Sequence, residues 1–164
     1  MSLFRAVCYV LAQLLGATIG AAMARHVSPE IFDRYNGGVN FIGPDVTLGG
    51  AFLAEFMGTF VLVFTVFCAI DTERGDEVFH MPTLAPLAIG LSVTLMHFGM
   101  IGIDNCSINP ARSFGASAVA GIWQDHWLFW FGPLTGSVGA AFMYELVFKS
   151  RKHWENKYLP YNSA

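Results

Sequence analysis

Ser107-Ile-Asn-Pro-Ala-Arg-Ser-Phe-Gly115 lies between two long apolar windows, in a segment that is rich in small residues but too short to cross a membrane. Asn109 is a favoured helix N-cap and Pro110 a favoured first helical residue, so this stretch predicts a short helix from Pro110 to about Val119. Non-helical backbone before it, at residues 105–108, is tolerated at membrane depth only where it lines a watery cavity or is buried in protein. The pattern indicates a re-entrant segment beside a pore.

The rest of the chain supplies membrane spans around this segment. Of its 164 residues 54% are hydrophobic and 13% charged, whereas soluble domains carry about 25% charged residues. Apolar windows of about 20 residues are long enough to cross a hydrocarbon core of roughly 30 Å as helices. Four such windows occur, at Ala6–Ala24, Thr47–Ile70, Leu84–Ile103 and Trp127–Phe148. The predicted fold class is an all-α membrane protein, with four transmembrane helices and one re-entrant half-helix.

The predicted organisation is a channel domain at residues 1–148, followed by a cytoplasmic tail at residues 149–164. Four spans place both termini on the same side of the membrane, and Lys and Arg accumulate on the cytoplasmic side. The side of the termini carries six such residues, namely Arg5, Arg74, Lys149, Arg151, Lys152 and Lys157. The first connection, at residues 25–46, carries Arg25 and Arg34 and contains Pro and Gly, so it is expected to be an extended extracellular loop. Both termini are therefore predicted to be cytoplasmic.

Small residues recur at intervals of four in two of the windows. They include Gly16 and Gly20 in the first window, and Gly132, Gly136 and Ala140 in the last. Such faces let membrane helices approach closely. We expect them to serve packing and assign them no site role.

Composition also excludes several classes of function. A net charge of -3 without a basic stripe argues against a nucleic-acid partner. The three cysteines, Cys8, Cys68 and Cys106, have no metal-ligand spacing. No nucleophile, base and orienting group occur together, no cofactor motif is present, and no cleavable signal peptide is evident. We therefore expect neither an enzyme nor a metal or cofactor protein.

The motif that opens the predicted half-helix, Asn109-Pro-Ala-Arg-Ser-Phe-Gly115, resembles that of the aquaporins, the major intrinsic protein family. Further matches in register are Phe4-Arg5-Ala6, Ala85-Pro-Leu-Ala-Ile-Gly-Leu91 and His126-Trp-Leu-Phe-Trp-Phe-Gly-Pro133. Family members contain two inverted repeats, each with three spans and one Asn-Pro-Ala half-helix. The resemblance implies that this sequence, up to about Phe148, contains the third span of the first repeat and all of the second. The first two spans and the first Asn-Pro-Ala loop are not present in it.

The motif Asn109, Pro110 and Ala111 has a direct electrostatic meaning. A helix that begins at Pro110 carries about half a positive elementary charge at its N-terminus, which repels cations. Asn109 can cap this end with its side-chain oxygen and still donate from its amide nitrogen to water. Such donors, together with pore width and the positive ends of half-helices, exclude protons in aquaporin-type pores.

The selectivity constriction is predicted to contain His97, Cys106 and Arg112. Arg112 follows Asn109 by nearly one turn, and an intramembrane arginine indicates a functional site. The resemblance implies that it belongs to the aromatic/arginine constriction; a structural arginine bonded to loop carbonyls is the alternative. His97 resembles the constriction histidine of water-selective members, whereas without that context it would read as a packing residue. Cys106 matches a position at which many water channels bind mercurials, although a small buried residue needs no such role.

The backbone carbonyls of Asn105, Cys106, Ser107 and Ile108 are expected to form an acceptor ladder that leads water to the constriction. Glu55 lies within the second window, where an unpaired carboxylate costs roughly 2.5 kcal/mol or more. The resemblance implies that Glu55 is a structural brace that accepts hydrogen bonds from the backbone of the re-entrant loop. A proton relay is the alternative for Glu55.

The function expected from this resemblance is passive transport of water, with proton exclusion, by the full-length parent of this segment. The expected partners are water and the lipid bilayer, and the resemblance implies a homotetramer. The expected location is the plasma membrane. Two alternatives stay open: another small neutral solute such as glycerol, or a truncated, non-conducting subunit that assembles with complete channels. Ser113, after Arg112, and His97 argue against glycerol, since glycerol conductors usually carry Asp and a smaller residue at these positions.

Overall fold

The computed structural model describes residues 2–71 and 84–148, and these residues contain helices and connections but no strand. An apolar pattern without strand-like alternation and with few internal breakers favours long helices. In chain order the elements are α1 (Leu3–Val27), α2 (Pro29–Arg34), η1 (Asn36–Gly38), α3 (Leu48–Ile70), α4 (Ala85–Asp104), α5 (Pro110–Ala120), α6 (Leu128–Met143) and the π-helical segment η3 (Tyr144–Phe148).

The predicted spans are present as helices. Within the described residues α1, α3 and α4 are long and apolar enough to cross a membrane, with 25, 23 and 20 residues. The fourth window is divided, because α6 has 16 residues in α-helical form and then continues as η3. The predicted half-helix is α5, which begins at Pro110 as expected and ends at Ala120. The prediction of an all-α membrane fold is therefore confirmed.

The expectation of an extended first connection is wrong for residues 25–38, whereas residues 39–47 form no helix. Residues 29–34 form α2, and a 3-10 turn follows at residues 36–38. Pro29 at the first helical position favours the start of α2. Arg25 then fixes the short helix against α1, since its Nη2 lies 3.3 Å from Asp33 Oδ1 and its guanidinium lies 5.7 Å from the ring centre of Phe32. Arg25 and its two partners belong to different helices, so their contacts do not appear as a periodic pattern in the sequence.

Close packing through glycine joins α6 to α3. A Cβ on Gly136 would lie 2.3 Å from the carbonyl oxygen of Phe56, and one on Gly132 would lie 2.7 Å from Cβ of Glu55. Only glycine permits this approach of two helix backbones. The predicted packing role of the small residues in the last window is therefore confirmed for this pair of helices.

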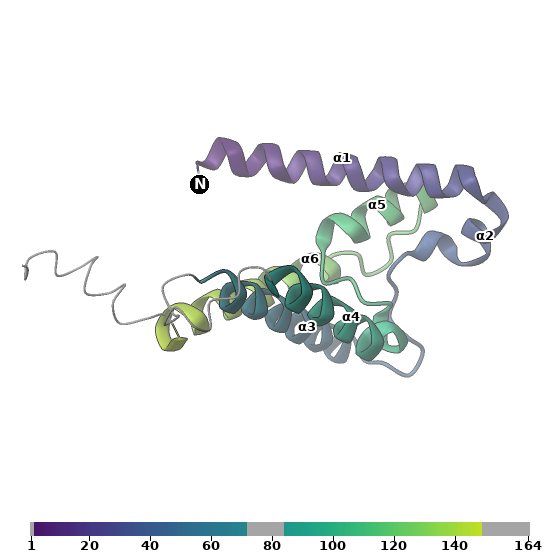
Figure 1. Ribbon diagram of the computed structural model, residues 1–164. Coiled ribbons are helices and arrows are strands. Elements are labelled where there is room, and N and C mark those ends of the chain that lie inside the picture. The colour runs from purple at the N-terminus through teal and green to yellow at the C-terminus, as the bar shows by residue number, and fades with distance from the viewer. Residues whose placement is uncertain (1, 72–83, 149–164) are drawn as a thin grey trace, which may run out of the picture.

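The helix α1 packs mainly on α5 and lies apart from α3 and α4 (Figure 1). Gly115 on α5 lies so close to α1 that a Cβ would come within 2.5 Å of the backbone carbon of Ala17. By contrast, Gly16 and Gly20 have open space beside them. The half-helix thus lies between α1 and the group formed by α3, α4 and α6.

Several predictions fall on residues outside the described part of the chain. They are the position of Arg74 in the second connection and the cytoplasmic tail at residues 149–164 with its four basic residues. Next to that tail, Tyr144 is buried, its ring stacks on Phe67 at 5.3 Å and its hydroxyl is hydrogen-bonded to Asp71. These contacts hold the end of α6 against the end of α3.

Candidate functional site

The site begins at the N-terminus of α5. Asn109 has extended backbone angles, and its Oδ1 accepts hydrogen bonds from the amides of Ala111 at 3.0 Å and Arg112 at 3.3 Å. These bonds use the side-chain oxygen, so the NH₂ group is the part of Asn109 that can donate to a ligand. The cap therefore presents donors and the positive end of a helix dipole on the same side.

The loop before α5 has an unusual backbone that two buried carboxylates hold in place. Asn105, Cys106 and Ile108 have positive φ angles of 64°, 48° and 44°, which cost energy in residues other than glycine. Glu55, which is 0% exposed, accepts from the amides of Ser107 at 2.6 Å and Ile108 at 2.7 Å. Asp104 Oδ1 accepts from the amide of Cys106 at 2.9 Å. The hydrogen bonds from three consecutive amides to these carboxylates therefore offset the cost of the strained backbone.

The direction of these amides also determines the direction of the carbonyls. The peptide bonds of the described residues include no cis bond, and in a trans peptide the carbonyl oxygen points opposite to the following N–H. The carbonyls of Asn105, Cys106 and Ser107 therefore point away from the two carboxylates. Such an arrangement is what an acceptor ladder requires.

Arg112 is half-buried and is held by the first connection. Its Nη1 donates to the carbonyl oxygen of Gly38 and to Oδ1 of Asn40, both at 2.6 Å. Two N–H groups of one nitrogen are thus used, and Nε and Nη2 carry the other three donors of the guanidinium. A fixed cation with free donors can exclude cations and still bind a neutral polar molecule.

Two cavities meet at Arg112 and Gly38, which line both. The first, of about 430 Å³, brings His97 and Arg112 together; it is lined by Arg34, Tyr35, Asn36, Gly38, Phe41, His97, Ile101, Asn105 and Arg112. The second, of about 580 Å³, brings Asn109 and Arg112 together; it is lined by Gln13, Gly16, Ala17, Ala21, Gly37, Gly38, Asn109, Ala111, Arg112 and Ala116. Five of the predicted site residues therefore line one or both of these cavities, namely His97, Asn105, Asn109, Ala111 and Arg112.

The orientation of His97 can be derived from one hydrogen bond. Its Nδ1 lies 2.9 Å from the carbonyl oxygen of Val93, one turn earlier on α4. A carbonyl can only accept, so Nδ1 carries the proton and Nε2 of the neutral ring is an acceptor. The cavity therefore has an acceptor on His97 and donors on Arg112, the two kinds of group to which water binds.

Cys106 does not line either cavity. Its side chain is fully buried and packs in a cluster with Met100 and Ile108. Asn105 lines the first cavity instead, and its Nδ2 donates to the carbonyl oxygen of Val39 at 3.1 Å. Among the constriction residues predicted from the sequence, the structure thus brings His97 and Arg112 to one cavity, whereas the side chain of Cys106 lines neither cavity.

Two polar residues in this region are absent from the sequence-based prediction. Asn40, in the first connection, is 2% exposed and Asp104, the last residue of α4, is 1% exposed. Asn40 stands in a polar loop without periodicity, and Asp104 lies just beyond the apolar window, so neither has a local signal of burial. The role of Asn40 depends on contacts with residues more than 60 positions away in the chain. The role of Asp104 depends on the folded loop, where it binds the amide of Cys106.

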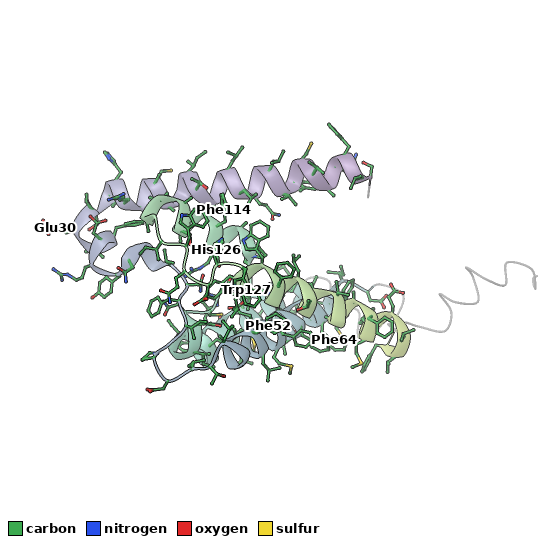
Figure 2. The ribbon with its side chains drawn as sticks, turned by 180° about the vertical axis from the view of Figure 1, so that it is seen from behind. Glu30, Phe52, Phe64, Phe114, His126 and Trp127 are labelled. Carbon is green, nitrogen blue, oxygen red and sulfur yellow. The ribbon has the colours of Figure 1, made fainter. Side chains whose placement is uncertain are left out.

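His126 joins the connection after α5 to α6. Figure 2 shows it beside Phe114, and the two ring centres are 6.4 Å apart. Trp130 Nε1 donates to His126 Nε2 at 3.1 Å, so the proton of the neutral ring is on Nδ1, which can donate to Ser117 Oγ at 3.3 Å. Burial lowers the pKa of His126 below its ordinary value of 6.5. The neutral ring therefore links α5 and α6 through two hydrogen bonds.

Known proteins are similar to this chain in sequence or in fold. The chain is 44% identical over 153 residues to "Probable aquaporin PIP2-6" of Arabidopsis thaliana, which covers 92% of this chain and 53% of that protein. It is 42% identical to "Aquaporin PIP2-5" of Oryza sativa subsp. japonica, over 92% of this chain and 54% of that protein. The chain therefore spans about half the length of these relatives.

A solved structure, that of the aquaglyceroporin from Plasmodium falciparum, superimposes with a TM-score of 0.72. It covers 90% of this chain and 66% of that chain at 23% sequence identity, so this likeness concerns the fold. Residues 1–144 match the sequence model of the family described as major intrinsic protein. With the Asn-Pro-Ala half-helix in place and most of its length matched, the chain belongs to the major intrinsic protein family.

Proposed function

We propose that the whole protein containing this chain is a passive, proton-excluding water channel, in which this chain supplies the constriction. The observation that carries the proposal is the first cavity, where His97 offers an acceptor and Arg112 offers donors in about 430 Å³ of space. A bulky imidazole and a fixed guanidinium leave room for a small polar molecule and exclude cations. Family membership makes the chain part of a channel and not of an enzyme.

The proposal assigns separate tasks to the site residues. His97 and Arg112 form the constriction, with Cys106 contributing its backbone. Asn109, Pro110 and Ala111 supply the donor and the positive helix end, and the carbonyls of residues 105–108 supply acceptors. Glu55 is the brace that holds the loop through two amides. The proposal also places the protein in the bilayer of the plasma membrane, as a homotetramer with cytoplasmic termini. In each subunit, residues 1–148 belong to the membrane domain and residues 149–164 form a tail.

Proteoliposomes test this function. The complete protein encoded by the gene is reconstituted, and osmotic shrinkage is followed by stopped-flow light scattering. We expect shrinkage faster than in empty liposomes, no proton leak with a pH-sensitive dye inside, and little glycerol flux. If folded and inserted protein gives water flux no faster than empty liposomes, the proposal is overturned and a non-conducting subunit is favoured. Rapid glycerol flux would instead favour a channel with a broader range of solutes.

A matched pair of variants assigns the activity to the constriction. In the double variant His97→Ala and Arg112→Ala, the width and the fixed positive charge are both lost, so glycerol flux and proton leak should increase relative to water flux. Glu30→Gln serves as the control, because Glu30 is exposed on α2 and lines neither cavity. An unchanged ratio of glycerol to water permeability in the double variant would contradict the assignment.

A further inference from the structure

We propose that Asn40 is a positioning residue that holds the guanidinium of Arg112 in the cavity and so determines which solutes pass. The inference rests on the proposed function and adds to it a residue of the first connection. Asn40 touches no cavity that we describe, so it would act through Arg112 and not on the permeating molecule.

The side chain of Asn40 is fixed by three hydrogen bonds. Its Nδ2 donates to the carbonyl oxygen of Asp104 at 3.0 Å, and its Oδ1 accepts from Arg112 Nη1 at 2.6 Å and from Ser113 Oγ at 2.7 Å. The partners define which end is oxygen. A rotated amide would place its NH₂ group against the guanidinium of Arg112 and its oxygen against the carbonyl oxygen of Asp104, so both hydrogen bonds would be lost. Asn40 therefore joins the end of α4 to the beginning of α5.

The connection that carries Asn40 is itself attached to α4. The amide of Gly43 donates to the carbonyl oxygen of Ile103 at 2.8 Å, and Asn105 Nδ2 donates to the carbonyl oxygen of Val39 at 3.1 Å. His97 lies on the same helix, two turns before Ile103. The distance between His97 and Arg112 is thus determined by α4 and this connection together, and not by α5 alone.

Arginine needs such support because its long side chain has many rotamers. In the folded chain Nη1 is held by two acceptors, one from the backbone of Gly38 and one from Asn40. Without Asn40 the guanidinium keeps one acceptor and can rotate about its last bonds. The charge would remain in the cavity, but its donors would no longer face His97 in one arrangement. Selectivity is then the property that should change first.

The first test measures selectivity. The complete protein, Asn40→Ala, Arg112→Ala and the double variant are reconstituted, and the ratio of glycerol to water permeability is determined for each. We expect the ratio to rise in Asn40→Ala and to equal that of Arg112→Ala in the double variant, since both changes act through one group. Asp45→Asn, an exposed change in the same connection, should leave the ratio unchanged. Additive effects, or an unchanged ratio in Asn40→Ala, would overturn the proposal.

The second test does not depend on conduction. Phenylglyoxal modifies accessible guanidinium groups, and peptide mass spectrometry gives the rate at Arg112. Loss of a hydrogen bond to a charged group should raise that rate about tenfold in Asn40→Ala. Asn40→Asp keeps the acceptor and should keep the slow rate. Equal rates in all three proteins would overturn the proposal, even if water flux is rapid.

The two tests keep this inference separate from the proposed function. If the parent protein conducts no water but Arg112 becomes reactive in Asn40→Ala, the proposed function fails and the positioning role stands. If the parent conducts and Arg112 reactivity is unchanged, the positioning role fails alone. Loss of folded protein in both Asn40 variants would also count against it, because Asn40 would then be needed for folding and not for the placement of Arg112.

Discussion

At the scale of single residues, the main feature is how few side chains hold the re-entrant loop. Glu55 and Asp104 together bind three consecutive amides of a backbone with positive φ angles. A buried carboxylate is costly without partners and stabilising with them. Because these amides point toward the two carboxylates, the carbonyls of Asn105, Cys106 and Ser107 point away from Glu55 and Asp104.

Glu55→Gln tests this role of the brace. The substituted amide can offer one acceptor and directs its NH₂ group toward a second N–H, so one buried donor loses its partner at a cost of about 1–3 kcal/mol. We expect a lower midpoint of thermal unfolding in detergent and faster proteolysis near residues 105–108. Glu30→Gln, on the exposed face of α2, is the control. If Glu55 were instead a proton relay, proton flux would change and the unfolding midpoint would not.

His126 gives a prediction about pH. Because burial lowers its pKa in the folded protein, the unfolded chain takes up a proton first as the pH falls below 6.5. The contribution of the neutral ring is therefore complete above pH 6.5 and is lost as the pH falls through the folded pKa. Protonation would also place a second donor opposite the indole N–H of Trp130.

The measurement is the unfolding midpoint between pH 7.5 and about pH 5. We expect it to fall on acidification, and to fall less in His126→Gln than in the parent. His26→Gln is the control, since His26 is exposed near the end of α1. The same slope in all three proteins would show that His126 does not cause the pH dependence.

At the scale of elements, close backbone approach determines how the helices group. Gly136 and Gly132 let α6 lie directly on α3, and Gly115 lets the half-helix lie on α1. Between lipid tails and apolar side chains there is little hydrophobic preference, so packing of this kind provides much of the attraction. Among the residues that the structure describes, Gly16 and Gly20 of α1 have no such neighbour.

Gly136→Val tests the α3–α6 contact. A Cβ at this position would lie 2.3 Å from the carbonyl oxygen of Phe56, so the two helices must separate. Overpacking of this kind costs about 1–3 kcal/mol. We expect a lower unfolding midpoint, whereas Gly16→Val, where a Cβ meets nothing within 4 Å, should have little effect. Similar losses in both variants would contradict the packing that we describe.

At the scale of the whole molecule, the arrangement predicts what the chain does alone. The helix α1 packs mainly on α5 and lies apart from α3 and α4 (Figure 1). The part of the chain that the structure describes contains one Asn-Pro-Ala half-helix, α5, and therefore supplies one positive helix end to the pore. We expect proteoliposomes with residues 1–164 alone to conduct little water compared with those holding a protein that has both half-helices. Equal flux per inserted molecule would contradict this expectation.

Much of the fold was predictable because its signals are local. Apolar windows give the spans, and Asn109 followed by Pro110 gives the beginning of α5, since capping depends on adjacent residues. The first connection was mispredicted at residues 29–38, where α2 and a 3-10 turn form and where Arg25 of α1 contacts Asp33 and Phe32. The last 5 residues of the last window also differ, because the chain leaves the α-helical form at Tyr144.

The sequence by itself therefore determined the class of the protein, its spans, its half-helix and the identities of His97, Asn109 and Arg112 as candidate site residues. Only the tertiary structure decided that His97 and Arg112 share one cavity, that the thiol of Cys106 packs outside it, and that Asn40 and Gly38 hold the guanidinium. The reason is physical. Hydrophobic length and helix capping act between near neighbours, whereas the position of a buried charge depends on acceptors that the fold brings from elsewhere in the chain.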